Sequence, residues 1–122
     1  MADNDFQAIV KAKELATHTF VLTSNSKRYP KKYRHSLVDE IQKKSLYIHN
    51  TLLEANRINN KTNKLERCEM ITKAITYCDE LLFYIELSMN LNLLEKDSKV
   101  YWSKLASDVK HMALAWRKKE QQ

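Results

Sequence analysis

The chain has 122 residues, no glycine and a single proline, and its formal net charge of +6 corresponds to an isoelectric point near 9.3. Because β-hairpin turns, phosphate-binding loops and nucleophile elbows rely on glycine, the composition disfavours sheets and nucleotide-binding loops and predicts an all-α protein. The length fits one domain over residues 1–122, and the positive charge permits an RNA or DNA partner without requiring one.

The N-terminal sequence Met-Ala-Asp-Asn-Asp is acidic, and no apolar run approaches the length of a signal sequence or a membrane span. We therefore expect a cytoplasmic protein that makes no membrane contact. The first helix is predicted to begin between residues 3 and 5 and to run to about Thr23. Its apolar residues fall mostly on one stripe: Phe6, Ile9, Val10, Leu15, Ala16 and Phe20.

Residues 23–26 are turn formers and predict the first connection, in which Asn25 would take a left-handed conformation in place of glycine. Pro30 suits the first turn of a second helix, where its missing N–H costs nothing, and it pushes Tyr29 toward an extended conformation. The second helix then continues to a connection at Asn59 and Asn60. Its apolar residues recur at steps of three and four: Leu37, Ile41, Ile48, Leu52 and Ala55.

The third helix has the most regular pattern, an unbroken alternation of three- and four-residue steps typical of a bundle seam. The seam residues are Cys68, Ile71, Ile75, Cys78, Leu82, Ile85 and Met89. Residues 90–97 predict the third connection, with Ser98 as N-cap of the fourth helix. The fourth helix repeats the pattern with Tyr101, Trp102, Leu105, Val109, Met112 and Trp116. Four helices joined by short connections predict an antiparallel up-down-up-down four-helix bundle.

The sequence contains no Glu-x-x-His or His-x-x-x-His pair, so we expect no metal and no cofactor. Cys68 and Cys78 would lie about 15 Å apart on one helix, too far to bond to each other, and seam thiols are commonly inert. The adjacent acids of the chain diverge by about 100° around a helix and form no catalytic dyad. We expect no enzyme and no small-molecule substrate.

The strongest functional signal is a basic cluster without an intervening acid, interleaved by Tyr29 and Tyr33. It comprises Lys27, Arg28, Lys31, Lys32 and Arg34. Lysine and arginine neutralise phosphates and tyrosine can stack on bases, so the mixture suits RNA or DNA, although a merely solvated surface remains an equal alternative. Trp102 and Trp116 could also stack on bases, but both continue an apolar stripe and are expected in the core or a subunit contact.

Two further basic groups are visible in the sequence. Around the second connection stand Arg57, Lys61, Lys64 and Arg67. On the fourth helix, Lys99, Lys110 and Arg117 fall within steps of about 20° and predict a basic stripe. In an antiparallel bundle the first and third connections share one end and the second lies at the other, so positive charge is spread over both ends.

Residues 29–59 read YPKKYRHSLVDEIQKKSLYIHNTLLEANRIN. This stretch resembles the second-helix signature, aromatic-Pro-Lys-x-x-Arg…Ser-Leu-x-Asp-x-Ile…Glu-Ala-Asn, of four-helix bundles related to the accessory variability determinant (Avd) of diversity-generating retroelements and to S23-type proteins. The matching positions are Pro30, Lys31, Lys32, Arg34, Ser36, Leu37, Asp39, Ile41, Glu54, Ala55 and Asn56. Residues 78–94 and 100–119 resemble the third and fourth helices, so the likeness covers nearly the whole chain.

The resemblance implies a homo-oligomeric ring, a homopentamer, whose basic surfaces engage the retroelement reverse transcriptase and nucleic acid, either template RNA or cDNA. It places Lys31, Lys32 and Arg34 at the contact with phosphate or partner. The chain departs from many relatives at Leu82 and Glu86, where they carry a pair of arginines. This departure favours the alternative implied by the S23-type branch, a protein-interaction scaffold with no nucleic-acid role.

Overall fold

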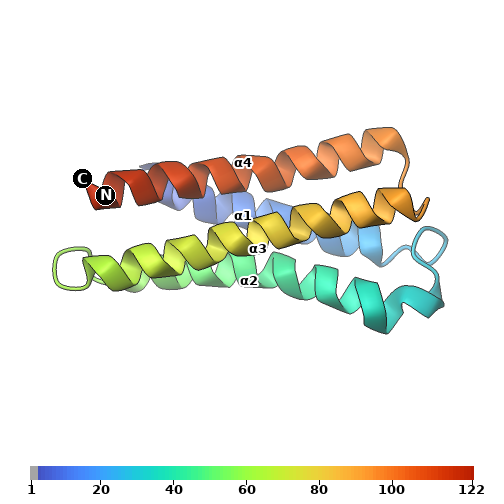
Figure 1. Cartoon of the computed structure of the whole chain (residues 1–122), viewed down its shortest axis with the longest axis horizontal. Helices are drawn as coiled ribbons and strands as arrows, with labels where there is room; N and C mark the ends of the chain where they lie inside the picture. Colours follow the sequence, from blue (N-terminus) through green and yellow to red (C-terminus); the bar gives the residue numbers. More distant parts are fainter. Residues whose placement is uncertain (1–2) are drawn as a thin grey trace.

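The computed structural model describes residues 3–122, and within that range every regular element is helical. Four long helices lie side by side along the molecule (Figure 1): α1 (Asp3–Thr23), α2 (Asp39–Arg57), α3 (Lys64–Asn90) and α4 (Lys96–Gln121). This confirms the prediction of an all-α protein with four helices.

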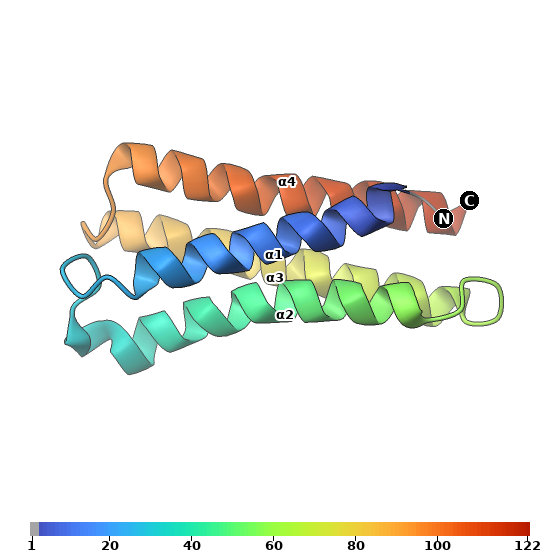
Figure 2. The ribbon, with the colours of Figure 1, turned by 180° about the vertical axis from the view of Figure 1, so that it is seen from behind.

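Each helix packs against two neighbours: α1 and α3 each contact both α2 and α4. The α1–α2 and α3–α4 connections lie at one end of the molecule, and the α2–α3 connection and the C-terminus lie at the other (Figures 1 and 2). At the first end the Arg28 side chain donates to Ser98 Oγ at 3.0 Å, and at the second Lys64 Nζ donates to the Gln122 carbonyl at 3.1 Å. This arrangement is compatible with the predicted antiparallel order.

The core follows the predicted seams of the last three helices closely. Their fully buried residues include Ile41, Ile48, Leu52, Ile71, Cys78, Ile85, Trp102 and Val109. Both tryptophans are buried, as expected, and each satisfies its indole N–H. Trp102 donates to Thr19 Oγ1 at 2.9 Å, and Trp116 donates to Glu120 Oε2 at 3.0 Å. Because a buried indole needs an acceptor, the bond from Trp102 to Thr19 helps to fix how α1 and α4 meet, whereas the bond from Trp116 to Glu120 lies within α4.

The predicted stripe of α1 is partly wrong, because Phe6 is 57% exposed. Ile9 and Leu15 are buried as predicted, but the rest of the buried face carries the smaller residues Ala8, Ala12, Thr19 and Thr23. The bulk of Trp102 explains the difference, since small residues on α1 leave room for the indole and Thr19 supplies its acceptor. Tyr101, which the pattern places on the apolar stripe of the fourth helix, is 55% exposed. Its ring packs edge-on against that of His18, with the ring centroids 5.0 Å apart.

The connections correct three further expectations. Asn25 does not take the left-handed conformation; its Oδ1 accepts from the Lys27 amide at 3.0 Å and its carbonyl accepts from the Tyr29 amide at 2.8 Å. The left-handed residue is Asn92 (φ 62°), which ends α3 with bonds from its own amide to Met89 and from the Leu93 amide to Ser88. This is a Schellman closure with asparagine where glycine is usual.

Ser98 is not the N-cap of α4, and the third connection is shorter than predicted. The helix begins at Lys96, with Glu95 in the capping position in an extended conformation (φ −79°, ψ 157°) and no side-chain cap. Ser98 instead lies in the first turn, where its hydroxyl accepts the hydrogen bond from Arg28. Ser98 therefore ties the α1–α2 connection to the first turn of α4.

His18 predicts a fall in stability at mildly acidic pH. Burial lowers its pKa below the ordinary 6.5, and its Nε2 is enclosed without a hydrogen-bond partner among the described residues. Because the unfolded chain then binds the proton more readily, the His18 contribution to the free energy of unfolding is full above pH 6.5 and is lost as pH falls through the lowered pKa. Urea unfolding at about pH 7.5 and about pH 5 should show a smaller difference for His18→Gln than for the wild type. An equal difference in both proteins would contradict this role.

Candidate nucleic-acid interface

The predicted basic cluster lies on an irregular segment between α1 and α2. Pro30 (φ −62°, ψ 159°) precedes a 3-10 turn, η1 (Lys31–Tyr33), so it caps the helical segment rather than standing inside its first turn. A π-helical turn, η2 (Arg34–Val38), follows and leads into α2, with the Asp39 amide donating to the Arg34 carbonyl. Such π turns are rare and frequently mark functional sites.

Four of the five cluster side chains are exposed: Lys27, Lys31, Lys32 and Arg34. Within residues 3–122 no carboxylate is paired with any of them, whereas Arg28 is half-buried and bonded to Ser98. Among the described residues, Lys32 also makes a cation–π contact, in which its Nζ lies 5.2 Å from the centroid of the Tyr33 ring. The structure thus brings four unneutralised cations together on one short segment.

Tyr29 is structural, which corrects the expectation that it could stack on bases. It is only 4% exposed, and burial raises the pKa of its hydroxyl. Tyr33 is half-buried and packs against the core, with the Lys32 ammonium near its ring. Tyr29 thus anchors the segment to the bundle, while the basic side chains of Lys27, Lys31, Lys32 and Arg34 are exposed.

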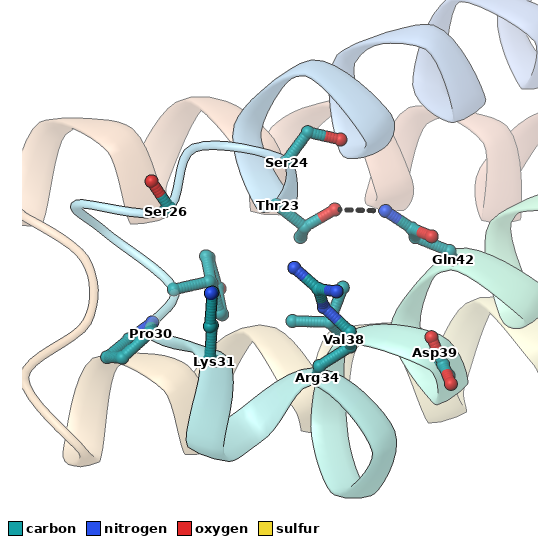
Figure 3. Close-up of a pocket in the computed structure, with 10 residues that line it drawn as sticks. Thr23, Ser24, Ser26, Pro30, Lys31, Arg34, Val38, Asp39 and Gln42 are labelled. Carbon is teal, nitrogen blue, oxygen red and sulfur yellow. Dashed lines mark hydrogen bonds between the residues drawn. The ribbon is translucent and has the colours of Figure 1, made fainter.

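A pocket of about 290 Å³ opens between the end of α1 and the start of α2 (Figure 3). Its lining residues are Thr23, Ser24, Ser26, Tyr29, Pro30, Lys31, Arg34, Val38, Asp39 and Gln42. In Figure 3 the side chains of Lys31 and Arg34 extend from the helical turns toward Thr23, whose hydroxyl accepts from Gln42 Nε2 at 3.0 Å. The Asp39 carboxylate points away from them and contacts His35 Nδ1 at 3.2 Å.

The second basic group, at the opposite end of the molecule, separates into surface and interior residues. Arg57, Lys61 and Lys64 are exposed. Arg67 is 6% exposed, so the structure removes it from the predicted surface. Its guanidinium donates to the carbonyls of residues 55, 56 and 58 at 2.8–3.3 Å, and its Nε lies 3.2 Å from Glu120 Oε2. Arg67 thereby satisfies the carbonyls at the end of α2, which have no partner in their own helix.

The basic stripe on α4 is largely neutralised by α3. Lys99 Nζ lies 3.3 Å from Glu86 and Lys110 Nζ lies 2.6 Å from Asp79, while Arg117 donates to Thr72 Oγ1 at 3.1 Å. Glu86 therefore pairs with a cation across the contact between α3 and α4. These surface pairs stabilise the fold by only about 0–1 kcal/mol each, but they cancel charge that a nucleic acid could use.

Other kinds of site have little support in the geometry. Within residues 3–122 no three potential metal ligands converge, and no helix there has both the length and the apolar character needed to cross a membrane. Cys68 and Cys78 are free and buried, in agreement with the expected seam positions. Burial raises the pKa of Cys78 to about 12, so this thiol stays protonated and unreactive at neutral pH.

Comparison of the chain with protein-family models, with curated proteins and with solved structures finds no match in any of the three. The functional assignment therefore depends on the residues described above and on the second-helix resemblance, and the exposed, unpaired cations of residues 27–34 are its strongest element.

Proposed function

We propose that this chain is a non-enzymatic, cytoplasmic accessory protein of a diversity-generating retroelement. It is an antiparallel up-down-up-down bundle that assembles into a homopentameric ring and binds the reverse transcriptase and nucleic acid, template RNA or cDNA. The observation that carries the proposal is the set of four exposed and unpaired cations on the α1–α2 connection: Lys27, Lys31, Lys32 and Arg34. Three of them belong to the matched second-helix signature.

Physical chemistry supports a contact role for this cluster. Cations in the first turn of a helix oppose the helix dipole, at a cost of about 0.3–1 kcal/mol each, so they are unfavourable for the helix that they begin. Lysine and arginine side chains that neutralise phosphates release counterions, and this release drives nucleic-acid binding without sequence preference. A bound polyanion would neutralise these cations and remove their unfavourable interaction with the helix dipole.

A salt titration tests nucleic-acid binding directly. Each phosphate neutralised on a single strand contributes about −0.7 to the slope of log K against log salt, so four contacts predict a slope of about −3. Fluorescence anisotropy of labelled single-stranded RNA at several salt concentrations measures it. The absence of any affinity at low salt would remove this function.

Assembly into a ring needs two different surfaces on each protomer, since a head-to-tail contact joins unlike faces. The bundle offers exposed apolar side chains on two helix pairs. One groove of about 560 Å³ between α1 and α4 includes Val21 and Tyr101, and another of about 340 Å³ between α2 and α3 includes Phe83.

Light scattering should give five times the monomer mass of 14.4 kDa, and a strict monomer would exclude the ring. Co-elution with the reverse transcriptase in size-exclusion chromatography tests the protein partner.

The neutralised α3–α4 face favours a second candidate, an S23-type scaffold that binds proteins only. In this chain Leu82 and Glu86 occupy the places of the arginines common in related bundles, and Glu86 pairs with Lys99. If the protein assembles but shows no salt-dependent RNA affinity, the scaffold function replaces the accessory one.

A further inference from the structure

We propose that the pocket between α1 and α2 binds a single phosphate group, with Lys31 and Arg34 as its cationic ligands. The biological source of that phosphate, a nucleic acid, rests on the proposed function, whereas the site itself follows from the geometry of the pocket. Nothing in the second-helix signature distinguishes the cations that face this pocket from those that face solvent.

Backbone geometry places the two cations together. Lys31 begins η1 and Arg34 begins η2, and the Arg34 amide donates to the Lys31 carbonyl, so the two residues lie one 3-10 turn apart. Residues three apart on such a turn lie on the same side of it. Figure 3 shows both side chains extending from this side toward the end of α1, over the same space.

Both cations lack an internal counter-charge. Of residues 3–122, none forms an ion pair or a hydrogen bond with the Lys31 or Arg34 side chain. Asp39, the acid on the pocket wall, is directed away from them and contacts His35 at 3.2 Å. The pocket therefore holds two positive charges, and its one carboxylate is engaged elsewhere.

The wall opposite the cations adds a fixed donor. Thr23 is buried, donates to the Thr19 carbonyl at 2.7 Å and accepts from Gln42 Nε2 at 3.0 Å, which holds the Gln42 amide at the pocket. An amide nitrogen carries two hydrogens, so Gln42 has a second one to donate. Lysine, arginine and an amide N–H together supply the donors that phosphate oxygens accept.

The volume is sufficient for a phosphate group. Pockets for drug-sized ligands range from about 300 to 1,000 Å³, so the 290 Å³ of this pocket lies at the lower limit. Arginine can bind two phosphate oxygens side by side, whereas lysine acts as a point charge. The two cations can therefore contact the same phosphate group.

Nuclear magnetic resonance with inorganic phosphate tests the site. At constant ionic strength, the Arg34 side-chain N–H and the amides of residues 24–29 and of Lys31 should shift with saturation in the full-length protein. The double variant Lys31→Gln/Arg34→Gln should bind phosphate at least about tenfold more weakly, because it loses charge-assisted hydrogen bonds. A wild type without saturable shifts at these residues would overturn the proposal.

The variant Lys27→Gln/Lys32→Gln is the matched control. It removes the same charge from the same segment, but neither residue lines the pocket. It should retain phosphate affinity within about twofold, since only long-range charge is lost. An equal loss in both double variants would show that diffuse charge, rather than the pocket, binds the anion. Circular dichroism confirms that each variant is folded.

Oligonucleotides distinguish the sources of the phosphate. One RNA sequence is compared with a 5′-phosphate and with a 5′-hydroxyl. Pocket shifts with the phosphorylated strand alone identify a terminal phosphomonoester, and equal shifts with both identify an internal phosphodiester. RNA binding that leaves the pocket unshifted would overturn the role of the pocket while sparing the proposed function. Saturable binding of inorganic phosphate without RNA binding would do the reverse.

Discussion

Replacing Arg67 by methionine is expected to lower the free energy of unfolding by about 3–5 kcal/mol, the cost of removing one member of a buried ion pair. Arg67 and Glu120 are both buried, with exposures of 6% and 8%. The variant leaves the Glu120 carboxylate without the Arg67 counter-charge and removes the Arg67 donor from the carbonyls of residues 55, 56 and 58, of which the first keeps the Ile58 amide. Urea unfolding followed by circular dichroism and tryptophan fluorescence measures the loss.

A second variant separates the two parts of this effect. Arg67→Met/Glu120→Gln should recover part of the lost stability, because it removes the unpaired buried charge while the amide oxygen at position 120 can still accept from Trp116 Nε1. Recovery should be incomplete, since the carbonyls of residues 56 and 58 still lack the Arg67 donor, whereas that of residue 55 keeps the Ile58 amide. The exposed Arg57→Met is the control, with an expected change within about 0.5 kcal/mol. If Arg67→Met unfolds at the same urea concentration as this control, the ion pair contributes nothing.

Replacing Lys31, Lys32 and Arg34 together by glutamine is expected to weaken RNA binding about 100-fold at about 0.1 M salt. Three lost phosphate contacts make the slope of log K against log salt shallower by about 2. Near 1 M salt the electrostatic contribution to binding is small, so the two proteins should bind RNA about equally there. When the salt concentration is lowered tenfold to about 0.1 M, a slope difference of about 2 makes the variant about 100-fold weaker than the wild type. Anisotropy titrations of both proteins measure the slope and the affinity together.

The control for this triple variant carries the same charge change elsewhere. Lys43, Lys73 and Lys118 are exposed lysines on α2, α3 and α4, outside the basic cluster. Their replacement by glutamine should change RNA affinity less than about threefold, because phosphate contacts are local and the remaining charge is screened. Equal losses in the two triple variants would show that net charge, and not the α1–α2 connection, determines binding.

The helices were predictable where the apolar steps are regular. The seam of α3 alternates steps of three and four, that of α2 follows the same helical period with one step of seven, and residues such as Ile48, Leu52, Ile71 and Ile85 are fully buried. In α1 the helical period alone did not indicate whether the larger or the smaller residues face the core. That choice depends on Trp102, which lies 83 residues from its acceptor Thr19 and is therefore a tertiary effect.

The candidate site was predictable in composition but not in geometry. The clustering of lysines and arginines is visible in the sequence, and four of the five are exposed. No local pattern indicates the 3-10 and π turns that set Lys31 and Arg34 over one pocket, because both depend on how residues 24–38 return to the bundle. Arg67 was assigned to the surface because its acceptors, the carbonyls at the end of α2, come together with it only when α2 and α3 pack.

The Asn92 turn shows that this fold closes its helices without glycine, and this affects the unfolded chain as much as the folded one. An ordinary domain of this length would contain about nine glycines, at about 7% of residues. Each side chain in place of a glycine restricts the backbone of the unfolded chain and, where the native conformation tolerates it, stabilises the fold by about 0.4–1 kcal/mol. This gain applies at positions with negative φ, and not at Asn92, whose positive φ favours glycine. Part of the stability of this bundle therefore resides in the stiffness of the chain when it is unfolded.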